Sequence, residues 1–164
     1  MAVTDFDQWQ ARVDAVWQDR ALSADERIAR IDALATELGD DHPVSLFERA
    51  GARDSAGRES EAEPLYRRAI ERGLDDRRRA RATIQLASTL RNLGETDDAL
   101  ALLDAERQRS GAELRDELAA FTALTLASAG DPVRAVSVAL TALAPHLTFY
   151  TRSVMGYAAE LASD

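Results

Sequence analysis

The sequence predicts an all-α fold, an array of antiparallel helix hairpins with about nine helices and no strand. Apolar residues recur three and four positions apart in successive segments, which is the spacing of helices with one buried face. A glycine followed five residues later by an alanine recurs at regular intervals along the chain, starting at Gly57, Gly94 and Gly130. The offsets between these copies are 37 and 36 residues. A near-constant offset of this length is typical of repeated hairpins that stack on one another.

The first 40 residues predict a divergent leading hairpin. Its first helix, residues 4–20, has a stripe that includes Trp9 and Trp17, and we expect both tryptophans in the core rather than as a ligand platform. Its second helix starts at Ser23, because Ser23 and Glu26 have the spacing of a capping box, and it ends at Gly39. This hairpin lacks the glycine–alanine spacing, so we expect it to cover the open end of the array.

Three repeats follow, over residues 43–73, 76–109 and 112–144. Pro43 suits the first turn of a helix, and the glycines at 57, 94 and 130 suit the turns between paired helices. A last helix over residues 146–162 has an apolar stripe and is expected to cap the array as part of a single domain, residues 1–164. The stripe consists of Leu147, Tyr150, Val154, Tyr157 and Leu161.

The composition excludes several classes of function. The formal net charge is −9 and the pI is near 4.8, which argues against a generic nucleic-acid binder. No cysteine is present, so disulfides and thiolate zinc sites are excluded. No apolar run reaches about 18 residues and no signal-peptide pattern opens the chain, so we expect a cytoplasmic protein without a membrane segment.

Residues 81–106 resemble a tetratricopeptide repeat, because Leu86, Ala87, Leu90, Gly94 and Ala99 follow that family's order of large apolar, small, glycine and alanine residues. The stretch from about 46 to 161, above all the run from Ile84 to Gly94, is similar to a bacterial, actinobacterial group of short proteins of this family. The resemblance implies a right-handed superhelix that binds a protein or peptide, without enzymatic activity and without a cofactor. It also implies that the first helix of each pair lines a concave groove.

The predicted groove has a polar strip on its central helix. Fork-like donors, amides and a hydroxyl lie three or four residues apart on one helical face, and neighbouring repeats add Asp54 and Phe121. The groove would grip an extended peptide or helix; the alternative is a solvated polar face with no ligand. Phe47 and Gly51 occupy the positions where related repeats carry a lysine and asparagine clamp for acidic C-terminal peptides, so that class of receptor is disfavoured. The strip comprises Arg81, Gln85, Ser88, Arg91 and Asn92.

The charges are unevenly distributed. Residues 1–48 carry a net charge of −7, and residues 67–91 carry +5. The run Arg77 to Arg79 opens a helix, where the helix dipole disfavours positive charge. Two interpretations stay open: an edge that binds an anion such as an acidic segment or phosphate, or internal pairing with the acidic hairpin.

The leading functional hypothesis is a non-catalytic scaffold that binds a protein or peptide partner. The alternative is a structural protein that self-associates through its end helices into a homo-oligomer. Nucleic-acid or phosphate binding through the arginine run is a weaker third hypothesis, because the net charge is negative. His42 and His146 lie far apart without metal-ligand spacing, and no motif for phosphate binding or nucleophilic catalysis is present, so we predict no enzyme and no metal site.

Overall fold

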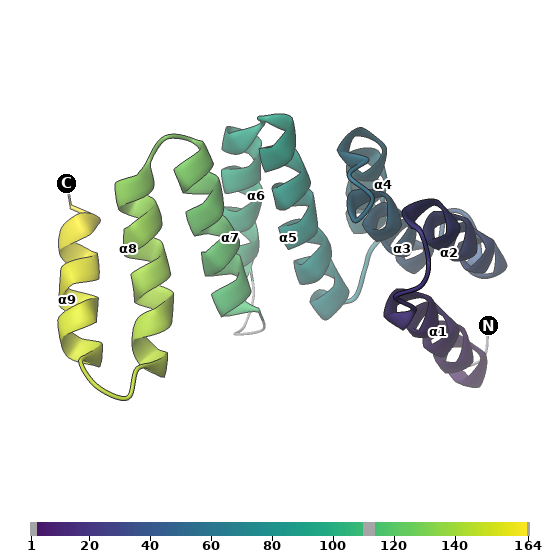
Figure 1. Ribbon diagram of the computed structural model, residues 1–164, viewed down its shortest axis with the longest axis horizontal. Helices are drawn as coiled ribbons and strands as arrows, with labels where there is room; N and C mark the ends of the chain where they lie inside the picture. The colour runs from purple at the N-terminus through teal and green to yellow at the C-terminus, as the bar shows by residue number, and fades with distance from the viewer. Residues whose placement is uncertain (1–2, 110–113, 164) are drawn as a thin grey trace. The chain divides into compact units, whose positions relative to one another are not determined.

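The computed structural model describes residues 3–109 and 114–163, and these residues form helices without any strand (Figure 1). The prediction of an all-α helical-repeat fold with about nine helices is confirmed for this part of the chain. Residues 1 and 2 of the predicted leading hairpin, and residue 112, where the third repeat was expected to begin, lie outside the described residues. The elements are α1 Val3–Gln18, α2 Ala24–Leu38, α3 Pro43–Asp54, α4 Glu59–Glu71, α5 Asp76–Leu93, α6 Thr96–Arg109, α7 Arg115–Ser128, α8 Pro132–Leu143, the 3-10 turn η1 Ala144–His146 and α9 Thr151–Leu161.

The chain divides into two compact units, residues 1–82 and residues 83–164, which we call unit 1 and unit 2. Unit 1 contains α1 to α4 and the first seven residues of α5. Unit 2 contains the rest of α5 and the elements that follow it.

Unit 1 is held together by an apolar core and by polar groups that fasten one helix to the next. The indole Nε1 of Trp9 donates to the carbonyl of Leu34 at 2.7 Å, which ties α1 to α2. The buried hydroxyl of Ser45 donates to the carbonyl of Ala35 at 3.0 Å, so α3 can approach α2 closely. The predicted capping box at the start of α2 is present. Buried apolar residues of this core include Trp9, Val13, Ile28, Ile31, Leu46, Phe47, Ala50, Ala62, Tyr66 and Ala69.

The glycine–alanine spacing has the structural role that the sequence predicted. Gly57, Gly94 and Gly130 stand in the turns between paired helices with φ of 71°, 87° and 86°, a backbone conformation that favours glycine. The alanines five residues later, at 62, 99 and 135, are buried where the second helix of each pair meets its neighbours. Ala139, the third-repeat counterpart of the buried Tyr66 and Leu103, is exposed.

Unit 2 packs α7 against α6 and α8, with α9 on the far side of α8 (Figure 1). Ala123, Leu126 and Ala135 form a buried cluster, against which Leu100 and Val138 pack. The buried hydroxyl of Ser137 in α8 donates to the carbonyl of Ala158 in α9 at 2.7 Å. This bond fixes which side of α9 faces α8.

The last helix differs from its prediction. It begins at Thr151 rather than near Leu147, because Ala144–His146 form a 3-10 turn and Tyr150 adopts a left-handed conformation with φ of 69°. The face of α9 toward α8 is centred on Ala158. Two tyrosines of the predicted buried stripe therefore lie in solvent: Tyr150 is 79% exposed and Tyr157 is 63% exposed.

Candidate functional site

The predicted polar strip lies along α5, and we call it the α5 strip: Arg81, Gln85, Ser88, Arg91 and Asn92. Each of these side chains is at least partly accessible. The residues between them that point to the other side of the helix are buried, namely Ala82, Thr83, Leu86, Ala87, Thr89 and Leu90. Ile84, between Arg81 and Gln85, is buried as well. The helix therefore separates a polar face from the core at the residues that the sequence indicated.

The polar groups of the α5 strip are only partly satisfied within the chain. The Arg91 Nη2 donates to the side-chain oxygen of its neighbour Asn92 at 3.0 Å. The amide oxygen of Gln85 and the Nε of Arg91 are inaccessible and have no hydrogen-bond partner among the described residues. The Arg91 stem is thus partly packed, and its guanidinium keeps donors that the neighbouring asparagine does not use.

In unit 1, Arg81 and Asp54 are brought to the same pair of aromatic rings. The guanidinium of Arg81 lies 5.3 Å from the centre of the Phe47 ring, a cation–π distance. The Phe47 ring lies 6.3 Å from that of Tyr66, whose hydroxyl donates to Asp54 at 3.3 Å. Burial, with the charge of Asp54, raises the pKa of Tyr66, so the phenol stays protonated and remains a donor. Two predicted site residues from different helices therefore meet in one cluster.

Glu48 of α3 is buried within unit 1. It is only 7% exposed, and it accepts a hydrogen bond from the indole Nε1 of Trp17 at 2.8 Å. Burial raises the pKa of Glu48, although the bond from Trp17 and the charges of Arg81 and Arg78 oppose this effect. The Trp17 ring also lies against Gly51, where a Cβ would be 3.4 Å from it. The indole of Trp17 thus packs against α3 at Gly51.

Sequence reasoning missed the pairing of Trp17 with Glu48, since it placed Trp17 only in the apolar core. One signal was present: Glu48 stands between Phe47 and Arg49 in a helix whose other residues are mostly small or apolar. A carboxylate that a helix buries needs a donor. The indole N–H of Trp17, 31 residues away, supplies it.

The remaining predicted residue, Phe121, lies on α7 in unit 2 and is partly exposed. Arg81 and Asp54 belong to unit 1, whereas Phe121 and the α5 strip from Gln85 onward belong to unit 2. The predicted site residues therefore fall into two groups. One belongs to the aromatic cluster of unit 1, and the other is the polar face of α5 from Gln85 onward together with Phe121 in unit 2.

The arginine run at the start of α5 is largely paired internally. Arg78 donates to Asp75 at 2.7 Å and to the side chain of Gln10 at 3.1 Å, and it lies 5.4 Å from the Phe6 ring. Arg79 pairs with Asp76. Burial would raise the pKa of Asp75, but hydrogen bonds from the side chain and backbone of Arg78 outweigh it and lower that pKa. Both acidic partners stand at the start of this helix rather than in the leading hairpin, so pairing of the run with the acidic hairpin stays a prediction.

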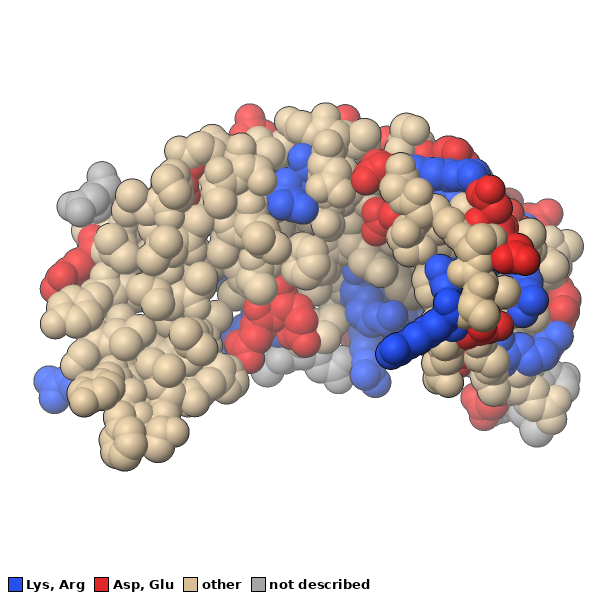
Figure 2. Space-filling view, viewed as in Figure 1, with Lys and Arg blue, Asp and Glu red and all other residues tan. Residues whose placement is uncertain are grey.

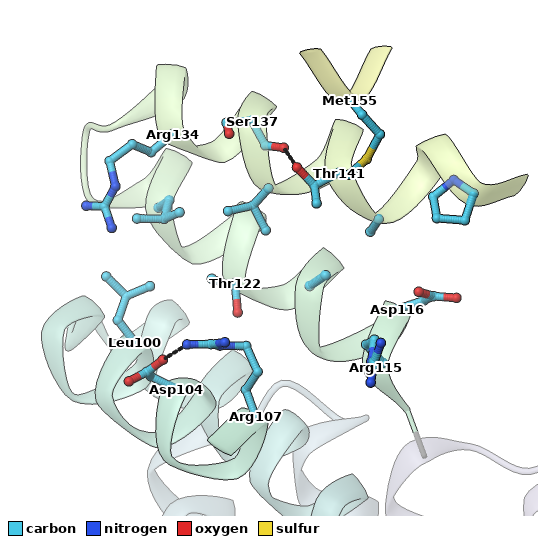
Figure 3. Close-up of a pocket in the computed structure, with 15 residues that line it drawn as sticks. Leu100, Asp104, Arg107, Arg115, Asp116, Thr122, Arg134, Ser137, Thr141 and Met155 are labelled. Atoms are coloured by element: carbon cyan, nitrogen blue, oxygen red, sulfur yellow. Dashed lines mark hydrogen bonds and ion pairs between the residues drawn. The ribbon is translucent and has the colours of Figure 1, made fainter. Parts of the chain in front are cut away.

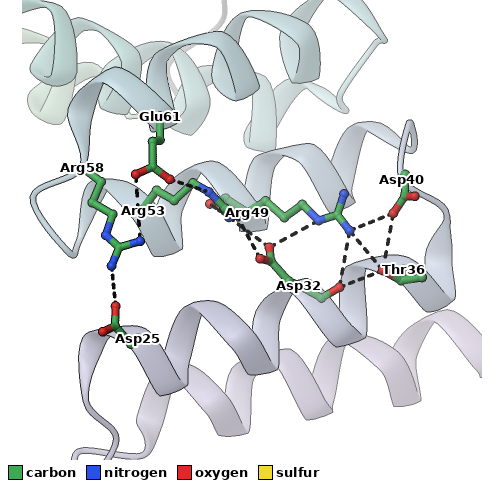
Figure 4. A network of polar contacts seen from close by, with 8 residues as sticks. All are labelled: Asp25, Asp32, Thr36, Asp40, Arg49, Arg53, Arg58 and Glu61. Carbon is green, nitrogen blue, oxygen red and sulfur yellow. Dashed lines mark hydrogen bonds and ion pairs between the residues drawn. The ribbon is translucent and has the colours of Figure 1, made fainter.

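The acidic leading hairpin also finds its counter-charges within unit 1 (Figure 4). Asp32 of α2 accepts two bonds from Arg53 of α3, both at 2.9 Å, and Arg49 bonds to Asp40 at 2.8 Å. Arg58 pairs with Asp25 at the other end of α2. The opposite charges of neighbouring segments thus fasten α3 and α4 to α2.

Unit 2 contains a cavity of about 640 Å³ that the sequence did not predict (Figure 3). It lies among α6, α7, α8, η1 and α9, and Leu100, Leu126 and Met155 are among its apolar lining residues. The hydroxyls of Ser137 and Thr141 in its wall donate to backbone carbonyls, at 2.7 and 2.8 Å, so they are already engaged. Its lining residues are up to 55 positions apart, which is why no local pattern indicated it.

No group of three or more potential metal ligands occurs in residues 3–109 and 114–163. No helix within the same ranges is long and apolar enough to cross a membrane.

Comparisons with known proteins complete the description of the site. A family model described as a tetratrico peptide repeat matches residues 43–161, which include every residue of the α5 strip, Asp54 and Phe121. No curated protein matches the chain.

Proposed function

The chain belongs to the tetratricopeptide repeat family, and from this membership we propose that it is a non-catalytic scaffold that binds a protein or peptide partner along the α5 strip. Repeats of this family typically mediate interactions between proteins. Stacked repeats present an extended surface rather than an enclosed pocket, which suits a polypeptide ligand. The net charge of −9 disfavours nucleic acid as the partner.

The observation that carries this proposal is the accessible polar face of α5 opposite its buried face. Exposed polar residues are ordinary, but here five polar groups follow one another over three turns of a single helix. The amide N–H groups of Gln85 and the hydroxyl of Ser88 suit the backbone carbonyls of an extended segment. The two arginines of the strip suit a carboxylate of the partner, because charge-assisted bonds to guanidinium are the stronger kind.

The experiment is affinity capture with the purified chain as bait, compared between the native chain and variants of the α5 strip. Gln85→Ala removes an amide, and Arg91→Gln removes the charge while it keeps most of the packed stem. If a partner carboxylate binds Arg91, the loss of a charge-assisted bond weakens binding by roughly 1.5–3 kcal/mol, which is at least tenfold in Kd.

The matched control is Arg109→Gln, which also removes one arginine charge but lies at the end of α6. We expect it to leave capture unchanged. Thermal unfolding of each variant separates a lost contact from a lost fold. A partner that binds Gln85→Ala and Arg91→Gln as tightly as the native chain would move the site away from α5.

A further inference from the structure

The C-terminal part of unit 2 has few charged side chains on the face shown in Figure 2. Over residues 131–163 the formally charged side chains are Asp131, Arg134, Arg152 and Glu160, whereas the whole chain contains 20 basic and 29 acidic residues. Of the exposed large hydrophobic residues in the described chain, most belong to this segment: Val133, Val136, Leu143, Phe149, Tyr150, Met155 and Tyr157. Exposed aromatic and apolar residues gathered in one place mark an interaction surface.

The outer face of α9 is central to this surface. Arg152, Gly156 and Glu160 follow one another at four-residue spacing, so they lie one above the other on the side of the helix opposite the buried Ala158. Tyr157 and Met155 flank this row on its two sides, and both are exposed. A Cβ at Gly156 would meet no atom within 4 Å, so the chain itself does not cover this face.

We propose that a second copy of this chain covers this surface, with the two α9 helices antiparallel and a twofold axis passing beside Gly156. Under that symmetry each residue before Gly156 faces the residue equally far after it. Arg152 of one copy therefore meets Glu160 of the other, and the reverse pair forms as well, which is the self-complementarity that a twofold dimer requires. The glycine at the axis lets the helices approach closely, and the two Tyr157 rings lie on the same side of the contact.

The placement of Arg152 and Glu160 at equal distances from Gly156 favours a second copy over an unrelated partner, although the net charge of the chain opposes it. Two chains of net charge −9 repel one another over most of their surfaces. The outer face of α9 is locally neutral, with one arginine and one glutamate placed symmetrically about Gly156. Since α9 has 11 residues and is about 16 Å long, the contact is small, and we expect a dimer that depends on protein concentration.

Sedimentation equilibrium over a range of concentrations tests the proposal with charge-swap variants. We expect the native chain to dimerise, and Arg152→Glu or Glu160→Arg alone to weaken the dimer at least tenfold, because each puts like charges opposite one another. The double variant R152E/E160R restores the opposite charges and should restore the dimer. Arg109→Glu, an equal charge change on α6, should have no effect.

A crosslink provides a second measurement, because the chain contains no cysteine. Gly156→Cys places one thiol beside the proposed axis, and mild oxidation should give a disulfide-linked dimer. Ser128→Cys, exposed at the end of α7, is the control for random collisions and should give little. A native chain that stays monomeric at all concentrations overturns the proposal. The proposal is also overturned if the single charge reversals leave the dimer unchanged or if the double variant does not restore it. The same holds if Gly156→Cys gives no more crosslinked dimer than Ser128→Cys. Gln85→Ala should leave the dimer intact, so this result is independent of partner capture.

Discussion

Glu48 gives a prediction in which a buried acid destabilises the native state at neutral pH. Its carboxylate is 7% exposed and accepts one bond, from Trp17. Burial raises its pKa in the folded chain above the value of about 4.3 that an unfolded glutamate has. Between the two pKa values the folded state binds more protons than the unfolded state. The free energy of unfolding therefore falls as pH rises through that window, and the loss persists above it.

Glu48→Gln removes the ionisation and keeps an oxygen that accepts the indole N–H. We expect this variant to be at least as stable as the native chain at pH 7.5, and to lack the component of the pH dependence that Glu48 contributes. Glu48→Ala removes the acceptor as well and leaves the Trp17 N–H without a partner. That variant should lose about 1–3 kcal/mol of stability.

Urea unfolding followed by tryptophan fluorescence, at several pH values from 4 to 8, is the suitable assay. Both tryptophans of the chain lie in unit 1, so the signal reports on the unit that contains Glu48. The control is Glu37→Gln, since a bond from Arg12 lowers the pKa of the exposed Glu37. A carboxylate whose pKa is lowered on folding stabilises the folded state at pH values above its pKa in the unfolded chain. Glu37→Gln should therefore be less stable than the native chain at neutral pH. If Glu48→Gln proved as unstable as Glu48→Ala at pH 7.5, the charge would be stabilising and the reasoning refuted.

Three further predictions concern local packing and backbone conformation. Ser23→Ala breaks the capping box of α2 and should cost about 0.5–2 kcal/mol, measured by urea unfolding of unit 1. Gly94→Ala should cost about 1–2 kcal/mol because φ at that position is 87°. Gly156→Ala lies in the middle of helical α9 with open space around it, so it should stabilise the monomer by about 0.5–1 kcal/mol. In thermal melts at low protein concentration the first variant should unfold at a lower temperature than the native chain and the second at a higher one; shifts in the same direction would contradict the backbone argument. Ala99→Leu forces three extra carbons into a fully buried site and should cost about 1–3 kcal/mol in a melt followed by circular dichroism; an unchanged melt would mean that the helix crossing is loosely packed.

Most of the secondary structure could be predicted, because it depends on neighbours within a few positions. The helix stripes, the capping box at Ser23 and the turns at Gly57, Gly94 and Gly130 all follow from periodicity and backbone preference. The polar face of α5 was predictable for the same reason, since spacing along one helix determines which residues share a face. Near the chain's end the same reasoning failed. From apolar spacing alone, α9 was predicted to begin before Thr151 and to bury a face that includes Tyr150 and Tyr157.

The sequence by itself determined the all-α repeat fold and the residues that the α5 strip exposes. Only the tertiary structure decided how distant residues meet: Trp17 with Glu48, Arg53 with Asp32, and Ser137 with Ala158. Whether a buried carboxylate finds a donor depends on which helix packs over it, and local periodicity carries no information about that pairing. The side of α9 left in solvent was settled in the same way, since the helix turns the face that bonds to α8 inward and leaves Gly156 and its neighbours uncovered.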